Sequence, residues 1–170
     1  MAVTLQGLRK KPLSNANIIY LNHHTPLTAT QMNATEKILY RFVATGTKTE
    51  FFELIFTPNR MIIAKTGGQP YLKFGEMLKA AEESKKKTAE LQQLTPEQIL
   101  ADNPENVSIT HSNITSIEMN RPGILGLGKI KIQIAGTNKR YEFRLALKKP
   151  EFQSHIDFLT SILKEKVIVK

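Results

Sequence analysis

The chain has 170 residues, of which 41% are hydrophobic and 23% charged, proportions typical of one globular domain and not of an intrinsically disordered chain. It contains no cysteine, which excludes disulfides, thiolate metal sites and a cysteine nucleophile. No apolar run approaches the roughly 20 residues of a membrane helix, and residues 1–11 lack the apolar core of a secretory signal. We therefore expect a soluble, cytoplasmic protein.

The net charge of +9 is unevenly distributed along the chain. Residues 1–33 carry +3, residues 34–68 carry +2 and residues 69–106 carry −2. Residues 107–170 hold eleven bases and five acids, which gives +6. A basic balance favours polyanionic partners such as nucleic acid, anionic lipid headgroups or an acidic protein. The alternative is a solvated surface that only keeps the protein soluble.

The first third of the chain predicts an arm and three strands. Residues 1–33 are weakly patterned, and we interpret them as an N-terminal arm. Apolar runs broken at Gly46 and at the Pro58-Asn59 turn predict an antiparallel meander. Its strands are expected over residues 37–44, 50–56 and 60–65. The middle strand is so apolar that both of its faces should be covered.

A helical insertion is predicted over residues 69–106. Phe74, Met77, Leu78 and Ala81 recur at the spacing of one helix face. A second, short helix should begin at Thr95-Pro96-Glu97-Gln98, where threonine can cap the helix and glutamine can complete a capping box.

The last third predicts four more strands and a helix. The strands are expected over residues 107–109, 114–119, 130–134 and 141–147. A glycine-rich loop, residues 123–128, precedes the third of them, and a turn at Gly136-Thr137-Asn138 follows it. The apolar positions of the final helix, which Pro150 opens, are Phe152, Ile156, Leu159 and Leu163. Residues 166–170 are expected to be a C-terminal tail.

Two short motifs carry a resemblance to a known family. Residues 56–63 (FTPNRMII) resemble the T-D-x-R-hydrophobic turn of the bacterial and archaeal PH-like (pleckstrin-homology-like, GRAM-like) domains, and residues 109–117 (ITHSNITSI) resemble their I-P-Y-x-x-I-x-x-I strand. The order of elements over residues 34–163 is similar as well. The resemblance implies an α+β domain, residues 34–165, in which about seven strands in two antiparallel sheets form a barrel capped by the C-terminal helix.

The resemblance does not extend to phosphoinositide binding. Lipid-binding members of the family carry a basic motif in the turn that joins the first two strands. Here that turn, residues 45–49, holds only Lys48 and is followed by Glu50.

The hairpin over residues 129–147 is the first candidate site. Its apolar residues are even-numbered in the first strand and odd-numbered in the second, so the numbers of facing residues must have an odd sum. We place a two-residue turn at Thr137-Asn138. The resulting pairs are Ile132–Phe143, Ile134–Tyr141, Lys131–Arg144 and Gln133–Glu142.

This register predicts an anion-binding face. The outward positions of the hairpin include four bases: Lys129, Lys131, Arg140 and Arg144. Like charges directly opposite each other are mildly destabilising, which favours the binding of an anionic partner. A solvated basic surface that prevents sheet-to-sheet aggregation is the alternative.

The glycine-rich loop is the second candidate site. Ile124, Leu125 and Leu127 stand close to Arg121, so the loop could insert into a membrane interface or a partner's groove. It is not a phosphate-binding loop, because no Ser or Thr follows the lysine and a strand rather than a helix comes next. The alternative is a bulged corner whose aliphatic side chains fold back over the end of the barrel.

No catalytic or metal-binding pattern is present. His23 and His24 are adjacent, His111 lies in a predicted turn and His155 lies on the last helix, without a second ligand at a metal-like spacing. No nucleophile motif and no paired acids in an apolar stretch are found. We expect no enzyme activity and no cofactor. Aromatic residues are only 7%, and Tyr141 and Phe143 point to the opposite face from Arg140 and Arg144. This pattern argues against stacking on nucleic-acid bases but not against weak phosphate binding, so nucleic acid is not the expected partner.

The sequence therefore predicts a non-catalytic binding or assembly module. A protein partner or self-association to a homo-oligomer ranks first, because sheet edges and the helical insertion offer surfaces for contact. Peripheral binding to anionic membrane lipids is the alternative, since the charge is basic and the glycine-rich loop is apolar.

Overall fold

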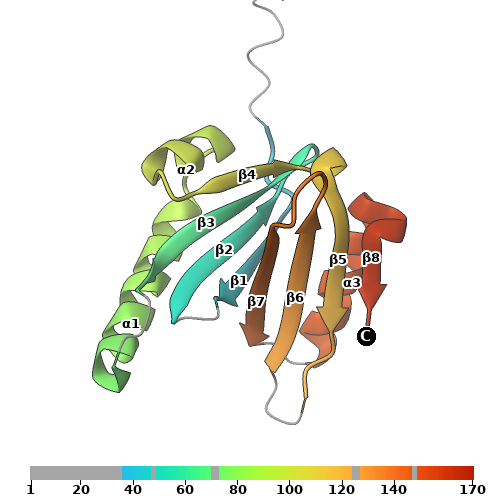
Figure 1. The fold of residues 1–170 in the computed structure, drawn as a ribbon. Helices are drawn as coiled ribbons and strands as arrows, with labels where there is room; N and C mark the ends of the chain where they lie inside the picture. The colour runs from blue at the N-terminus through green and yellow to red at the C-terminus, as the bar shows by residue number, and fades with distance from the viewer. Residues whose placement is uncertain (1–35, 47–48, 70–72, 124–126, 147–148) are drawn as a thin grey trace, which may run out of the picture. The chain divides into compact units, whose positions relative to one another are not determined.

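The chain forms an eight-stranded mixed β-sheet with three α-helices (Figure 1). The computed structural model describes residues 36–46, 49–69, 73–123, 127–146 and 149–170. The strands are β1 (Tyr40–Thr45), β2 (Glu50–Phe56), β3 (Arg60–Gly68), β4 (Val107–Thr110), β5 (Ile114–Asn120), β6 (Leu127–Ile134), β7 (Arg140–Ala146) and β8 (Val167–Val169). The helices are α1 (Phe74–Leu91), α2 (Pro96–Asp102) and α3 (Lys149–Leu163), with short 3₁₀ turns at η2 (His111–Asn113) and η3 (Lys164–Lys166). The predicted α+β class is confirmed.

The strand order is β4-β3-β2-β1-β7-β6-β5-β8, and all neighbours are antiparallel except the parallel pair β5–β8. The edge strands β4 and β8 do not pair with each other in the described part of the chain, so a closed barrel of two antiparallel sheets is not observed. Two features distinguish the sheet from that expectation. Strand β8, which lies in the segment expected to be a tail, extends the β5 edge. Among the described residues, strands β1 and β7 pair only at Thr45 and Arg144.

The main core lies on the inner face of the sheet, against α3. The even-numbered residues of β1 and β2 point into it, and Phe42, Leu54 and Phe56 are fully buried there. Phe152, Leu159 and Leu163 of α3 complete this core, with Ile156 partly buried, as their helical spacing predicts. Burial of this apolar surface is the main contribution to stability.

A second, smaller core lies on the outer face of β2 and β3. Ile55, Ile62 and Ala64 point outward from the sheet and pack against Leu91 of α1 and Ile99 of α2. Strand β2 is thus covered on both faces, as its composition predicts. The helical insertion is the cover, since α1 and α2 stand between β3 and β4 in the chain (Figure 1).

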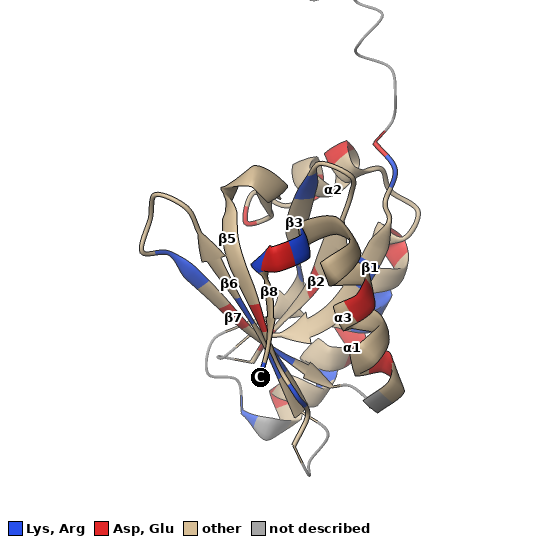
Figure 2. Cartoon of the chain, turned by 90° about the vertical axis from the view of Figure 1, so that its right-hand side faces the viewer, with Lys and Arg blue, Asp and Glu red and all other residues tan. Residues whose placement is uncertain are grey.

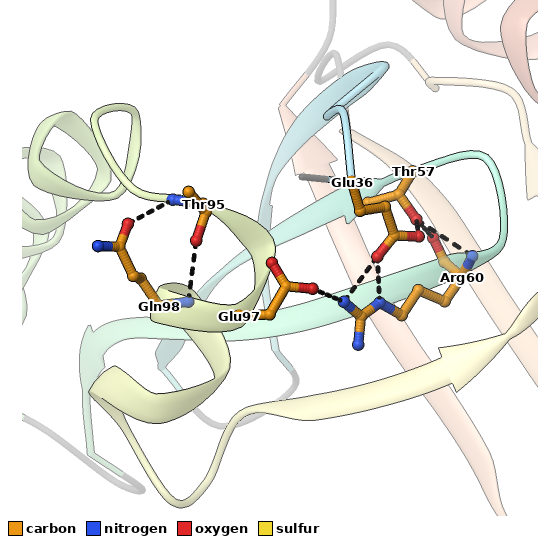
Figure 3. A network of polar contacts seen from close by, with 6 residues as sticks. All are labelled: Glu36, Thr57, Arg60, Thr95, Glu97 and Gln98. Atoms are coloured by element: carbon orange, nitrogen blue, oxygen red, sulfur yellow. Dashed lines mark hydrogen bonds and ion pairs between the residues drawn. The ribbon is translucent and has the colours of Figure 1, made fainter. Parts of the chain in front are cut away.

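A polar network joins the insertion to the β2–β3 turn (Figure 3). One Nη atom of Arg60 lies 2.6 Å from carboxylate oxygens of both Glu36 and Glu97, the latter in the first turn of α2. The hydroxyl of Thr57 donates to Glu36 at 2.5 Å and accepts the amide N–H of Arg60 at 3.2 Å. The predicted capping box of α2 is confirmed, because Thr95 and Gln98 exchange hydrogen bonds between side chain and backbone (Figure 3).

We predict that Ile99→Ala lowers the free energy of unfolding by about 3 kcal/mol, because it opens a cavity between α2 and the sheet. Ile99 has no exposed surface. Urea unfolding measures the change. The matched control is Leu39→Ala, since Leu39 is 41% exposed and should change stability by less than about 0.5 kcal/mol. Equal losses for the two variants would show that the insertion does not pack on the sheet in solution.

Candidate functional site

The outer face of the sheet is covered on one half and open on the other. Helices α1 and α2 lie over β2 and β3, while none of the described helices lies over β5, β6 and β7 on this side (Figure 1). The inward residues of these three strands, among them Ile117, Ile130 and Phe143, are buried in the main core. Because side chains alternate across a sheet, their neighbours along each strand form the open surface.

The open surface gathers the four bases predicted for the hairpin. Lys129 and Lys131 lie on β6, and Arg140 and Arg144 lie on β7, all at outward positions. Lys170, next to β8, adds a fifth base, since its Nζ reaches Glu118 on the outer side of β5. We call these five residues the basic face.

The predicted hairpin register is wrong by two residues. Lys131 lies opposite Glu142 and not opposite Arg144, while Lys129 lies opposite Arg144. The other observed pairs are Ile130–Phe143, Ile132–Tyr141 and Gln133–Arg140. The predicted parity was correct, so the same residues point outward, but their neighbours across the hairpin differ.

The turn explains the shift. Residues 135–139 connect the two strands, and the amide of Ile134 donates to the carbonyl of Lys139 at 3.4 Å, which leaves a loop of four residues, 135–138, between this pair. Gly136 adopts a φ of 68°, a conformation that glycine permits at little cost. The side-chain amide of Gln133 closes the turn by donating to the carbonyls of Thr137 and Lys139. A four-residue loop replaces the two-residue turn and keeps the alternation of both strands.

Two acids, Glu118 and Glu142, lie within the basic face. Figure 2 shows acidic segments in red beside basic segments in blue on this part of the sheet. The carboxylate of Glu118 lies 3.0 Å from Lys170 and 3.4 Å from Arg140. The carboxylate of Glu142 lies 3.7 Å from Lys129 and 4.0 Å from Lys131. The hydrogen bond from Lys170 lowers the pKa of Glu118, which favours the anionic form. Five bases against two acids leave this surface with an excess of positive charge.

Arg144 differs from the other four bases. Among the described residues, no acidic side chain lies within 4.0 Å of its guanidinium, which is exposed. Its neighbour across the hairpin is Lys129, so two cations stand together at this end of the face. A guanidinium can bind a carboxylate through two parallel hydrogen bonds. This corner therefore offers the strongest anion-binding chemistry of the surface.

The second predicted site is only partly described. Ile124 and Leu125 lie outside the described residues. Leu127 belongs to β6 rather than to a loop, lies opposite Ala146 and is 46% exposed. The exposed Arg121 donates its backbone N–H to the carbonyl of Lys170 at 3.0 Å. The structure thus places Leu127 at an exposed position at the start of β6.

His111 and His155, the histidines among the described residues, are partly buried side chains. The Nδ1 atom of His155 lies 3.0 Å from the hydroxyl of Tyr40, and its ring stacks on Phe42. Burial lowers the pKa of both His155 and His111. His23 and His24 lie outside the described residues. No cluster of three metal-ligating side chains occurs in the part of the chain that the structure describes.

A buried carboxylate lies beside the open surface, beneath α1. Glu53 on β2 is 1% exposed, and one of its oxygens accepts a hydrogen bond from Arg41 at 3.1 Å. Arg41 also donates to the carbonyl of Leu91, the last residue of α1. Burial raises the pKa of Glu53, against the opposing effect of Arg41. The pair ties β1 and β2 to the helix and has no access for a substrate, so we assign it a structural role.

None of the described helices is long and apolar enough to cross a membrane. In comparisons with known proteins, no family model and no curated sequence matches the chain. The candidate site therefore rests on its own geometry and charge.

Sequence reasoning missed three residues of this region. Lys170 and Glu118 are joined through the β5–β8 pair, and no local pattern predicted that pairing. Val43, at the border between the covered and open halves, is 62% exposed. A signal for Val43 was present, because it occupies the outward phase of a strand whose other phase holds Tyr40, Phe42 and Ala44.

We predict that the stability of Glu53→Gln relative to the wild type increases as the pH rises from about 4.5 to 8. A folded-state pKa above the ordinary value of 4.5 means that stability is present at low pH and is lost as the pH rises through the folded pKa. Glutamine does not titrate, so the variant does not lose stability in this way as the pH rises. Chemical unfolding of both proteins at several pH values gives the difference, and the shared histidines cancel in it. A difference that does not change with pH, or that moves the other way, would contradict the raised pKa.

Proposed function

We propose that this protein is a non-catalytic binding module that recognises an acidic segment of a partner protein through its basic face. The observation that carries the proposal is the open outer surface of β5, β6 and β7, on which five bases surround two acids. An acidic segment would add carboxylates to a surface that has too few of them. We also propose a PH-like architecture, supported by the chain order of four strands (β1–β4), three strands (β5–β7) and the helix α3, after which β8 joins the sheet beside β5.

The ion pairs within the face do not oppose such binding. Exposed pairs contribute only about 0–1 kcal/mol each, so exchanging an internal carboxylate for a partner's carboxylate costs little. The side chains of Lys129, Arg140 and Lys170 are each about half exposed, at 48%, 44% and 55%. They can therefore reorient toward a partner without disturbing the core.

The charge of the basic face also favours one of the two kinds of protein partner. If two copies met face to face through the basic face, bases would oppose bases, which is unfavourable. We therefore favour an acidic partner over self-association at this surface. Anionic membrane is the second candidate, and the observation that favours it is the exposed Leu127, which directly precedes Gly128 and Lys129.

The direct test is binding of an acidic probe. The probe is a labelled ten-residue peptide with eight acidic residues around a central Ser-Ser pair. Fluorescence anisotropy measures the affinity of the protein for this peptide. We predict that Arg144→Glu weakens binding about tenfold, a loss of about 1.4 kcal/mol, because it replaces an attraction by a repulsion. High salt should weaken binding to the wild type as well, since the contacts are exposed. The matched control is Lys37→Glu, which changes the same charge at an exposed position before β1 and should alter affinity less than about twofold.

Three outcomes would overturn the proposal. Equal losses for Arg144→Glu and Lys37→Glu would show an unspecific effect of net charge. Sedimentation with phosphatidylserine vesicles that is lost in Leu127→Asp, without binding of the peptide, would favour the membrane. A salt-insensitive mass well above 19.2 kDa by light scattering, without peptide binding, would favour self-association.

A further inference from the structure

A groove adjoins the basic face at the corner of Arg144. It lies between α1 and the ends of β1, β2 and β7, and its volume is about 350 Å³. The residues that line it include Thr45, Phe51, Met77, Leu78 and Arg144. This volume lies at the lower end of the range for ligand sites. It suits one or two apolar side chains better than a large cofactor.

The lining of the groove is mostly apolar and is continued on the sheet. Leu78 is 56% exposed, whereas Ala80 and Ser84 of the same helix are buried against the sheet. Val43 is 62% exposed and lies two residues before Thr45 on the same face of β1. The groove and Val43 therefore form one apolar strip along the border between the covered and open halves of the outer face.

Arg144 connects this strip to the basic face. It lines the groove and is also the base without an acidic neighbour among the described residues. Its Cα partners are Thr45 on β1 and Lys129 on β6. If an apolar side chain of a ligand peptide occupied the groove, the residues next to it in that peptide would lie within reach of Arg144 and Lys129. Apolar surface next to two cations fits a segment that has apolar side chains flanked by carboxylates.

We propose that the groove between α1 and β1 binds apolar side chains of the acidic partner segment, while Arg144 and Lys129 bind the flanking carboxylates. This inference rests on the proposed function and names the partner more closely as an acidic segment with an apolar centre. The basic face supplies attraction that is sensitive to salt, and the groove supplies selectivity for the apolar centre.

The test compares two peptides on the full chain. Both carry eight acidic residues in ten, but one has Leu-Leu at its centre and the other Ser-Ser. We expect the wild type to bind the Leu-Leu peptide about tenfold more tightly, since partial burial of two leucines supplies about 1.4 kcal/mol. Leu78→Ser and Val43→Ser should each lower the affinity for the Leu-Leu peptide about threefold to fivefold. Neither variant should change the affinity for the Ser-Ser peptide.

Leu39→Ser is the matched control, because Leu39 is an exposed leucine that precedes β1 and does not line the groove. It should leave both affinities unchanged. All three substituted residues are exposed, so the variants should unfold at the same urea concentration as the wild type, which the same samples check.

The outcomes separate the two proposals. If both peptides bind the wild type equally and with salt sensitivity, the groove inference is wrong and the proposed function stands. If neither peptide binds, the proposed function itself is wrong. If light scattering shows a dimer that Leu78→Ser dissociates, a second copy and not an acidic segment occupies the groove.

Discussion

The rest of the structure depends on the burial of the β2–β3 pair on both of its faces. The inward residues Leu54, Phe56 and Met61 belong to the main core, and the outward residues Ile55 and Ile62 would be exposed without a cover. The chain supplies this cover immediately after β3, as α1 and α2, and returns to the sheet as β4. The insertion is therefore part of the hydrophobic core. Its position also leaves the other half of the outer face without a described helix.

The border between the two halves is the place where the chemistry of the surface changes. On the covered side, Arg41 holds the buried Glu53 and the end of α1 together. On the open side, outward positions carry charges that are balanced only in part, and Arg144 stands at the edge. Val43 and Leu78 lie along this border as exposed apolar residues. A surface that combines exposed apolar and charged side chains follows from the way in which one half of the sheet is covered.

The two candidate sites differ in how well sequence reasoning could place them. The four bases of the hairpin share a face because strand alternation has a period of two, and that period is visible in the sequence. Their neighbours could not be predicted, because a shift of two residues preserves the alternation and only the turn geometry selects between the registers. The position of Lys170 on this face could not be predicted for a different reason, because the parallel pairing of β8 with β5 joins segments about fifty residues apart.

The sequence by itself determined the type and order of seven strands and three helices, the capping box at Thr95, the two-sided burial of β2 and the side of the sheet on which the hairpin residues lie. These follow from local periods and from short-range hydrogen bonds, which neighbouring residues specify. Tertiary structure alone decided the register of the hairpin, the addition of β8 and the packing of α1 over β2 and β3. Each of these depends on contacts between distant segments, and several arrangements satisfy the same local pattern. The open basic face and the adjoining groove depend on these contacts between distant segments.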